Sequence, residues 1–279
     1  MKKTILTFTI VALAVFLSAS FNFANATILG NHFGVTLSVD SNGSFDNSWI
    51  PTPSTADYVT GDWESTSGAP NPSPHGTQGE AFDVEAIYID DAGTDFLFAI
   101  VTSIPEAGYD GADFGWSGYH FNPGDIRIDA GGGKYEYGVK VTGANQGDIL
   151  KNATWSYDKG NAGYKNGYPN SGSTMYNNMH VGTGLKTGDV TSFAYYDAQI
   201  TERNYGTYVI EGIISKSSLG NPGKGSSIGL EFSPDCNNDW LSLTGDIDGS
   251  SIPVPEPSTF LLLGGSIGIV VLLRKKIKL

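Results

Sequence analysis

Cysteine is almost absent from this chain, since Cys236 is the only one among its 279 residues. A disulfide within one copy of the chain is therefore impossible, and stability must come from a hydrophobic core or from bound ions. A lone thiol can be buried or can pair between chains. We expect Cys236 to be buried and inert, and not to be a catalytic nucleophile.

Histidine is also scarce, and the chain lacks the spacings that zinc sites use. The four histidines are His32, His75, His120 and His180, and none stands in an H-E-x-x-H or H-x-H arrangement. No motif indicates a Ser/His/Asp triad. The many acidic residues could supply a glycosidase-like carboxylate pair, but most of them should be solvated. We predict that the protein is not an enzyme, with a secreted hydrolase as the low-ranking alternative.

Positive charge is scarce outside the two ends of the chain. Six of the 16 lysines and arginines lie in the terminal segments, whereas Glu256 is the only one of the 29 acids that does. The part between those segments therefore keeps 10 basic and 28 acidic residues and has a formal net charge of −18. Such a surface repels nucleic acid and anionic lipid. It suits solubility, divalent cations or neutral ligands such as glycans, and halophilic or marine adaptation explains it equally well.

The first 26 residues have the organisation of a signal peptide. Lys2 and Lys3 precede an apolar stretch from Ile5 to about Leu17, and Ala24-Asn25-Ala26 forms an A-x-A cleavage site. We expect residues 1–26 to be removed and the mature chain to begin near Thr27.

Residues 249–279 form a second terminal signal. Residues 252–259 contain a Pro-Glu-Pro triplet, residues 260–273 are apolar, and residues 274–279 carry a basic cluster. Proline prevents a helix from extending back through the triplet, and the basic end stays cytoplasmic under the positive-inside rule. The apolar run is short for a membrane span, which suits a segment that is held briefly and then processed. The residues expected to carry the signal are Pro255, Glu256, Pro257, Arg274, Lys275 and Lys276.

This tail resembles a PEP-CTERM sorting signal, which bacterial exosortases read. The resemblance implies that an exosortase processes the protein. The protein would pass through an inner-membrane intermediate held by residues 260–273 and then reach the cell surface or the extracellular matrix. An ordinary C-terminal anchor is the alternative.

Residues 27–248 are predicted to form one all-β domain, a single jelly-roll-like β-sandwich. Short runs rich in Val, Ile, Tyr and Phe are separated by Gly, Asn, Asp, Ser and Thr, and no convincing amphipathic helix is present. The expected strands are Phe33–Asp40, Phe82–Ile89, Phe96–Ser103, Asp125–Asp129, Tyr135–Thr142, Ser192–Asp197, Tyr205–Ile214, Ile228–Phe232 and Trp240–Thr244.

Two of these strands carry more specific predictions. Phe96–Val101 is apolar on both faces, so it should lie in the middle of a sheet and pair with Phe82–Ile89 across the Asp90–Asp95 loop. In Asp125–Asp129 isoleucines alternate with charged residues, as in a half-exposed strand. Residues 42–78 and 143–191 are expected to be long irregular loops.

The central part is similar to a group of exosortase-dependent surface proteins. The segments that carry this resemblance are Gly79–Tyr88, Phe98–Ser103, Gly124–Asp129, Tyr135–Val139, Tyr208–Glu211 and Cys236–Asp239. The last of these usually reads Cys-Gly-Asn-Asp, so Asn237 is a departure. The resemblance implies a location and a fold, and it implies no biochemical activity. A more distant likeness to extracellular β-sandwich modules that bind carbohydrate or haem is analogy of fold.

Turn chemistry is the favoured interpretation of the acidic loops, and calcium is the cofactor that they would hold otherwise, because hard cations prefer several oxygen ligands. One candidate group consists of Asp90, Asp91 and Asp95, and the other of Asp235, Asn237 and Asp239. Neither fits an EF-hand, and Asp and Asn are also ordinary turn residues. Candidates for stacking on sugars are the aromatic residues Trp116, Tyr119, Trp155 and Tyr157, for which packing within loops is the alternative.

These observations predict an exported, non-enzymatic protein with a structural or adhesive role in the envelope or polysaccharide matrix. Its partners would be an exosortase and extracellular polysaccharide, and not nucleic acid. The alternative from another class is a carbohydrate-binding module of the extracellular matrix.

Overall fold

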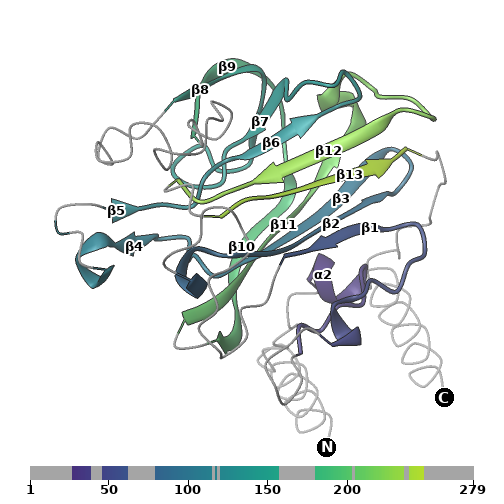
Figure 1. Cartoon of the computed structure of the whole chain (residues 1–279). Coiled ribbons are helices and arrows are strands. Elements are labelled where there is room, and N and C mark those ends of the chain that lie inside the picture. Colours follow the sequence, from purple (N-terminus) through teal and green to yellow (C-terminus); the bar gives the residue numbers. More distant parts are fainter. Residues whose placement is uncertain are drawn as a thin grey trace, which may run out of the picture.

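The computed structural model describes residues 27–38, 46–61, 79–114, 117, 120–156, 180–202, 205–235 and 239–247. The described part is an all-β protein with short helical turns (Figure 1). These turns are α2 (Ile28–Asn31), η1 (Asn47–Trp49), η2 (Gly79–Phe82), η3 (Gly111–Phe114) and η6 (Lys216–Leu219). The prediction of an all-β fold is confirmed.

The strands form two large antiparallel sheets and one small hairpin. Sheet A contains, in spatial order, β1 (Asp57–Thr60), β2 (Val84–Asp91), β3 (Asp95–Thr102), β11 (Tyr205–Ser215) and β10 (Thr191–Glu202). Sheet B contains β13 (Leu241–Asp246), β12 (Ser227–Phe232), β6 (Ile126–Asp129), β7 (Tyr137–Val139), β8 (Asp148–Ser156) and β9 (His180–Asp189). The hairpin pairs β4 (Tyr109–Asp110) with β5 (His120–Phe121).

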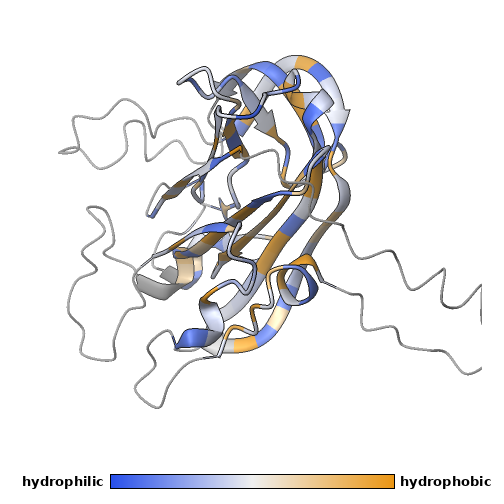
Figure 2. Cartoon of the chain, turned by 90° about the vertical axis from the view of Figure 1, so that its right-hand side faces the viewer, coloured by the Kyte–Doolittle hydropathy of each residue, from blue (hydrophilic) through white to orange (hydrophobic). Residues whose placement is uncertain are grey.

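The two sheets pack face to face as a β-sandwich. Alternate residues of each strand point into one shared core, which includes Phe98 and Ile100 of β3, Ile126 and Ile128 of β6, and Phe232 of β12. Figure 2 shows hydrophobic residues along the strands of both layers. The core follows from the period-two alternation of apolar residues in these strands.

Both long sides of the sandwich are closed. On one side the chain passes from β9 in sheet B to β10 in sheet A through Val190 alone, so one continuous segment borders both sheets. On the other side β13 lies beside β1, and the backbone N–H of Asp246 donates to the Asp57 carboxylate at 3.0 Å. These contacts protect edges that could otherwise pair with other chains.

Strand β3 is buried on both of its faces, as predicted. It lies in the middle of sheet A between β2 and β11. One face meets the sandwich core, while Leu97, Ala99 and Val101 point outward into a second apolar cluster. That cluster is closed by residues 27–38 and 46–56, which we call the N-terminal cover, and α2 of this cover lies below sheet A in Figure 1.

The N-terminal cover corrects one prediction. Phe33–Asp40 was expected to be a strand, but residues 33–38 form none. Gly34 and Leu37 have φ angles of 69° and 53°, which interrupt extended backbone. The apolar side chains Phe33, Val35 and Leu37 nevertheless all point onto sheet A, so their alternation reflects burial without strand pairing.

The two stretches expected to be irregular also contain strands. Strand β1 lies within residues 42–78, and β8 and β9 lie within residues 143–191. Strand β9 contains three glycines and two threonines, and β8 contains Asn152 and Thr154, which concealed both strands. Their pairing is irregular, with three register shifts, because such residues specify register weakly.

Candidate functional site at one end of the sandwich

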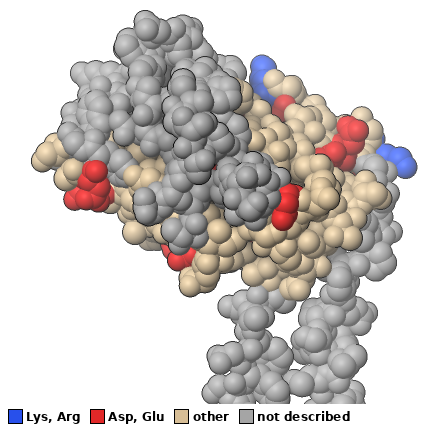
Figure 3. Space-filling model, turned by 60° about the horizontal axis from the view of Figure 1, so that its bottom comes forward, with Lys and Arg blue, Asp and Glu red and all other residues tan. Residues whose placement is uncertain are grey.

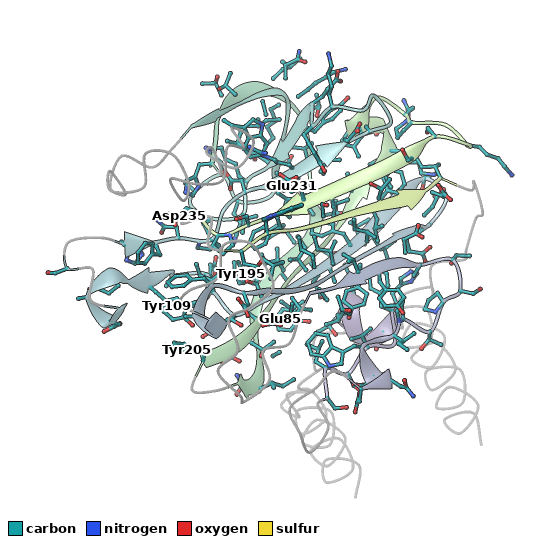
Figure 4. All side chains as sticks on the ribbon, viewed as in Figure 1. Glu85, Tyr109, Tyr195, Tyr205, Glu231 and Asp235 are labelled. Atoms are coloured by element: carbon teal, nitrogen blue, oxygen red, sulfur yellow. The ribbon has the colours of Figure 1, made fainter. Side chains whose placement is uncertain are left out.

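Segments that carry the sequence resemblance meet at one end of the sandwich. There β2 begins, β3 ends, β6 begins and β12 ends, next to the β4–β5 hairpin. We call this the motif end and define it by its acidic residues, Asp83, Glu85, Asp125, Asp235 and Asp239. Figure 4 labels Asp235, Tyr109 and Tyr205 on the side where β4 and β5 lie.

Asp239 joins the two sheets at the motif end. Its carboxylate accepts a hydrogen bond from the backbone N–H of Val84 at 2.7 Å, and its carbonyl accepts one from the hydroxyl of Ser233 at 2.6 Å. Only 6% of Asp239 is exposed. This last residue of the Cys-x-Asn-Asp motif therefore fixes the start of β2 against the connection between β12 and β13.

Asp83 and Glu85 fasten β2 to the end of β3. The carbonyl of Asp83 accepts hydrogen bonds from the Thr102 hydroxyl at 2.7 Å and the Ser103 backbone N–H at 3.0 Å. The Ser103 hydroxyl donates to the Glu85 carboxylate at 2.9 Å. Both acids are buried.

Asp125 is a buried carboxylate whose two oxygens both accept backbone hydrogen bonds. The donors are the N–H groups of Val141 at 2.8 Å and Val181 at 2.7 Å. Burial raises the pKa of Asp125, and these two bonds together with nearby His180 and Lys140 partly oppose that rise. Asp125 thus joins β6 to the start of β9 and to the residues that follow β7.

His180 lies between two carboxylates. Its Nδ1 is 3.9 Å from Asp125 and its Nε2 is 3.6 Å from Asp235. The amide of Asn122 also donates to Asp235 at 3.4 Å. A histidine placed in this way can carry a positive charge between the acids, so it can bind β9 electrostatically to β6 and to the end of β12.

Aromatic residues cover the side of the motif end that faces the β4–β5 hairpin. The hydroxyl of Tyr109 donates to the Ser103 carbonyl at 2.8 Å, and that of Tyr195 donates to the Ile104 carbonyl at 2.6 Å. Burial raises the pKa of both tyrosines well above the ordinary value, so both remain neutral donors. The rings of Phe82 and Phe121 pack edge to face, with centroids 5.1 Å apart.

The first predicted calcium group is not assembled as a set of ligands. Asp90 and Asp91 are consecutive residues of β2 and point to opposite faces of sheet A. The Asp90 carboxylate oxygen Oδ2 lies 2.7 Å from Nε2 of His32. Asp91 instead forms an ion pair with Lys216 and accepts a hydrogen bond from the backbone N–H of Gly93. The Asp95 carboxylate accepts a hydrogen bond from the Thr94 hydroxyl at 2.9 Å.

The second predicted calcium group is described in part, because Asn237 lies outside the described residues, as does Cys236. Asp235 and Asp239 both belong to the motif end, where they make the contacts given above. Among the described residues, no three or more His, Cys, Asp or Glu side chains are grouped to hold a metal ion.

Trp155 is the one predicted stacking residue that the structure describes; Trp116, Tyr119 and Tyr157 lie outside the described part. The Arg127 guanidinium lies 4.6 Å from the centre of the Trp155 ring. The ring edge packs on Gly138 so closely that a Cβ there would be 3.1 Å from it. Trp155 is therefore a packing residue on the outer face of sheet B.

Arg127 and Glu231 form a buried ion pair beneath Trp155, with Nη1 and Oε1 3.0 Å apart. Burial raises the pKa of Glu231, while Arg127 and a hydrogen bond from Tyr135 oppose the rise. Sequence alternation correctly placed Arg127 on the face of its strand that points away from the sandwich core. It also predicted that this face would be exposed to solvent, which is wrong, because only 8% of Arg127 is exposed. The acid within the apolar run Leu230-Glu231-Phe232 was the available signal for this pair.

The exposed surface of the described residues shows scattered acids. On the face in Figure 3, Asp and Glu side chains lie at separate places with few Lys or Arg between them. The acidic character found in the composition is therefore spread over this face.

Residues 253–276 match the family model of the PEP-CTERM protein-sorting motif. No curated protein and no solved structure gives a significant match to the chain. The prediction of a PEP-CTERM, exosortase-dependent protein is confirmed by the family match. The motif indicates a secreted protein that transits the membrane and is sorted to the cell surface after processing by an exosortase.

Both terminal signals, residues 1–26 and 249–279, lie outside the described residues. Within the described part, no helix combines the length and the apolar character that a membrane span requires. Leu29 is the first described buried hydrophobic residue and Ile247 is the last.

Proposed function

We propose that the sandwich has a structural or adhesive role in the cell envelope or the extracellular polysaccharide matrix, and that it is not an enzyme. The proposal rests on the hydrogen bonds that the acids of the motif end accept within the fold. A glycosidase needs two carboxylates that face a substrate across a gap. Here Asp125 and Asp239 accept hydrogen bonds from backbone N–H groups of distant strands, and Glu85 accepts the Ser103 hydroxyl.

The same contacts suit a load-bearing surface protein. They link the starts of β2 and β9 to distant parts of the chain, at an end that has no disulfide to hold it. Closed sheet sides limit uncontrolled association between copies. A scattered acidic surface maintains solubility outside the cell. Its negative charge repels anionic matrix components but does not repel neutral polysaccharide.

The test compares the host with and without the gene, and then with the gene restored. We expect loss of the protein to weaken cohesion of the extracellular matrix, measured as the shear needed to release polysaccharide, and we expect the wild-type gene to restore it. A variant with Glu256→Ala, which we expect to impair sorting and which leaves the sandwich sequence unchanged, should fail to restore cohesion. Full cohesion in the deletion strain would contradict a structural role.

Two further measurements separate the alternatives. Selective binding to one polysaccharide on a glycan array would favour a carbohydrate-binding module. Turnover of polysaccharides or esters by the purified protein, abolished by Asp235→Asn, would favour a secreted hydrolase. We expect no turnover, since the carboxylates of Glu85, Asp125, Asp235 and Asp239 already accept hydrogen bonds within the fold.

A further inference from the structure

The outer face of sheet A is an apolar surface that depends on the N-terminal cover. Ala86 and Tyr88 of β2, Ala99 and Val101 of β3, and Val209 of β11 all point outward from the sandwich core. Leu29, Phe33, Val35, Leu37 and Trp49 of the cover bury this face, and the Tyr88 hydroxyl donates to the Trp49 carbonyl at 2.9 Å. A detached cover would expose a contiguous apolar patch, which is unfavourable in water.

Two carboxylates on this face fasten the cover. Asp90 of β2 contacts His32 at 2.7 Å. Glu211 of β11 holds the beginning of the cover, because one carboxylate oxygen accepts the N–H of Ile28 and the other accepts the N–H of Leu29, both at 2.9 Å. The Tyr196 hydroxyl donates to Glu211 at 3.3 Å.

Glu211 differs from three other buried acids of the sandwich in having only neutral donors among its described contacts. Asp91 pairs with Lys216, Glu231 pairs with Arg127, and Asp90 contacts His32. Within the described part of the chain, no Lys, Arg or His forms an ion pair with Glu211, although only 4% of it is exposed. A buried carboxylate without a counter-charge is costly. In accord with this, burial raises the pKa of Glu211 despite the hydrogen bonds.

The expected export cleavage would create a positive charge beside this carboxylate. Cleavage after Ala26 makes Thr27 the first residue and gives it an α-ammonium group in place of an amide. The Thr27 nitrogen lies one residue, at most about 3.6 Å, from the Ile28 nitrogen. The Ile28 nitrogen is itself 2.9 Å from the Glu211 carboxylate. The Thr27 hydroxyl already caps α2 by accepting the Gly30 N–H at 3.0 Å, which holds this residue at the start of the helix.

We propose that Glu211 is the binding site for the mature N-terminus, so that removal of the signal peptide supplies the missing counter-charge and locks the N-terminal cover onto sheet A. The uncleaved chain has an uncharged amide at Thr27 and docks the cover more weakly. Completion of the fold is thereby coupled to export. The coupling uses a covalent event that happens once, outside the cytoplasm.

The experiment uses the mature protein purified from its native host. Mass spectrometry first identifies the N-terminal residue, which we expect to be Thr27. The α-amine is then acetylated at neutral pH, where it is far less protonated than the lysines, whose pKa is about 10.4 against about 8 for the α-amine. Acetylation removes the charge and leaves every side chain unchanged. We expect the melting temperature of the wild type to fall by roughly 2–4 °C.

Two variants locate the effect. Acetylation should lower the melting temperature of Asp90→Asn as much as that of the wild type, because Asp90 fastens a different part of the cover. It should have little effect on Glu211→Gln. An unchanged wild-type melting temperature, an equal loss in Glu211→Gln, or a mature N-terminus other than Thr27 would overturn the proposal.

A second measurement needs no variant. An ammonium held beside a carboxylate loses its proton less readily. The α-amine should therefore react with acetylating reagent about ten times more slowly in the native protein than in urea, whereas an exposed lysine such as Lys224 serves as the internal reference. Equal slowing of the α-amine and the reference lysine would contradict the ion pair.

Discussion

The carboxylate of Asp239 accepts a hydrogen bond from the backbone N–H of Val84 at 2.7 Å, although the two residues are 155 positions apart in the sequence. The contact joins the motif before β13 to the start of β2, and both residues are buried. It shows that an acidic motif found by resemblance can have a structural role, since the carboxylate satisfies a buried backbone donor at the start of β2.

Removing this carboxylate should destabilise the sandwich. Asp239→Ala leaves the Val84 N–H buried without its acceptor, so the free energy of unfolding should fall by about 1–3 kcal/mol. Asp239→Asn keeps an acceptor oxygen and should lose less. Urea denaturation measures both, with Asp113→Ala on the exposed η3 turn as the control. Equal stability of Asp239→Ala and the control would show that the hydrogen bond is unimportant.

The protein should become more stable on mild acidification. Burial raises the pKa values of Asp125 and Glu231 above those of the unfolded chain. The folded protein therefore binds protons more readily at these sites than the unfolded chain does. Their contribution to stability is fully present at a pH below their pKa values in the unfolded chain, and it is lost as the pH rises through their pKa values in the folded protein. The net charge of −13 acts in the same direction, since acidification reduces repulsion.

Melting temperature measured from pH 7.5 down to pH 5 tests this sign. We expect a rise on acidification, and a smaller rise in Glu231→Gln because one contributing group has been removed. Hydrogen bonds lower the pKa values of Asp46, which is half-buried, and of Asp189, which is exposed. Both lie near the surface and should oppose the trend only weakly. A melting temperature that falls steadily between pH 7.5 and pH 5 would mean that the fold needs these acids ionised.

Calcium should leave the melting temperature unchanged. Asp90, Asp91 and Asp239 are already engaged by His32, Lys216 and the Val84 N–H. A bound ion present at roughly 100-fold excess over its Kd would stabilise the protein by about 2.7 kcal/mol. Melting curves in calcium and in chelator measure the difference. A calcium-dependent gain that disappears in Asp235→Asn would establish the second predicted site instead.

Trp155 should contribute to stability and not to sugar binding. Its ring contacts Arg127 and Gly138, so Trp155→Ala should lower the free energy of unfolding by about 2–4 kcal/mol, while Trp155→Phe should lose less. Unfolding curves and glycan-array signals are compared for both variants. A variant that keeps wild-type stability but loses glycan binding would support the stacking interpretation.

The fold was predictable where local sequence determined it. The unbroken apolar run of β3 predicted a central strand buried on both faces, and the structure confirms it. Phe33, Val35 and Leu37 gave the same alternation as a strand, yet they belong to the cover. Their place in the cover depends on the hydrogen bonds that Glu211 accepts from Ile28 and Leu29. Glu211 is more than 180 positions away from these two residues, so the contact leaves no local pattern in the sequence.

The motif end was predictable only in part for a similar reason. Asp235 and Asp239 were singled out as oxygen ligands, but their partners come from other strands and their acceptor roles depend on that assembly. Asp125 was expected to be half exposed because it alternates with apolar residues. The structure buries it because the backbone N–H groups of Val141 and Val181 use both of its oxygens.

The tail should direct this sandwich to the cell surface through an exosortase. The most direct measurement is the mass and cellular fraction of the protein in four samples: wild type, Glu256→Ala, a variant with residues 274–276 neutralised, and wild type in a host that lacks its exosortase. We predict a processed surface form in the wild type alone, with full-length protein retained in the membrane in the other three. The same mature surface form in all four samples would contradict exosortase processing and would make the tail an ordinary anchor.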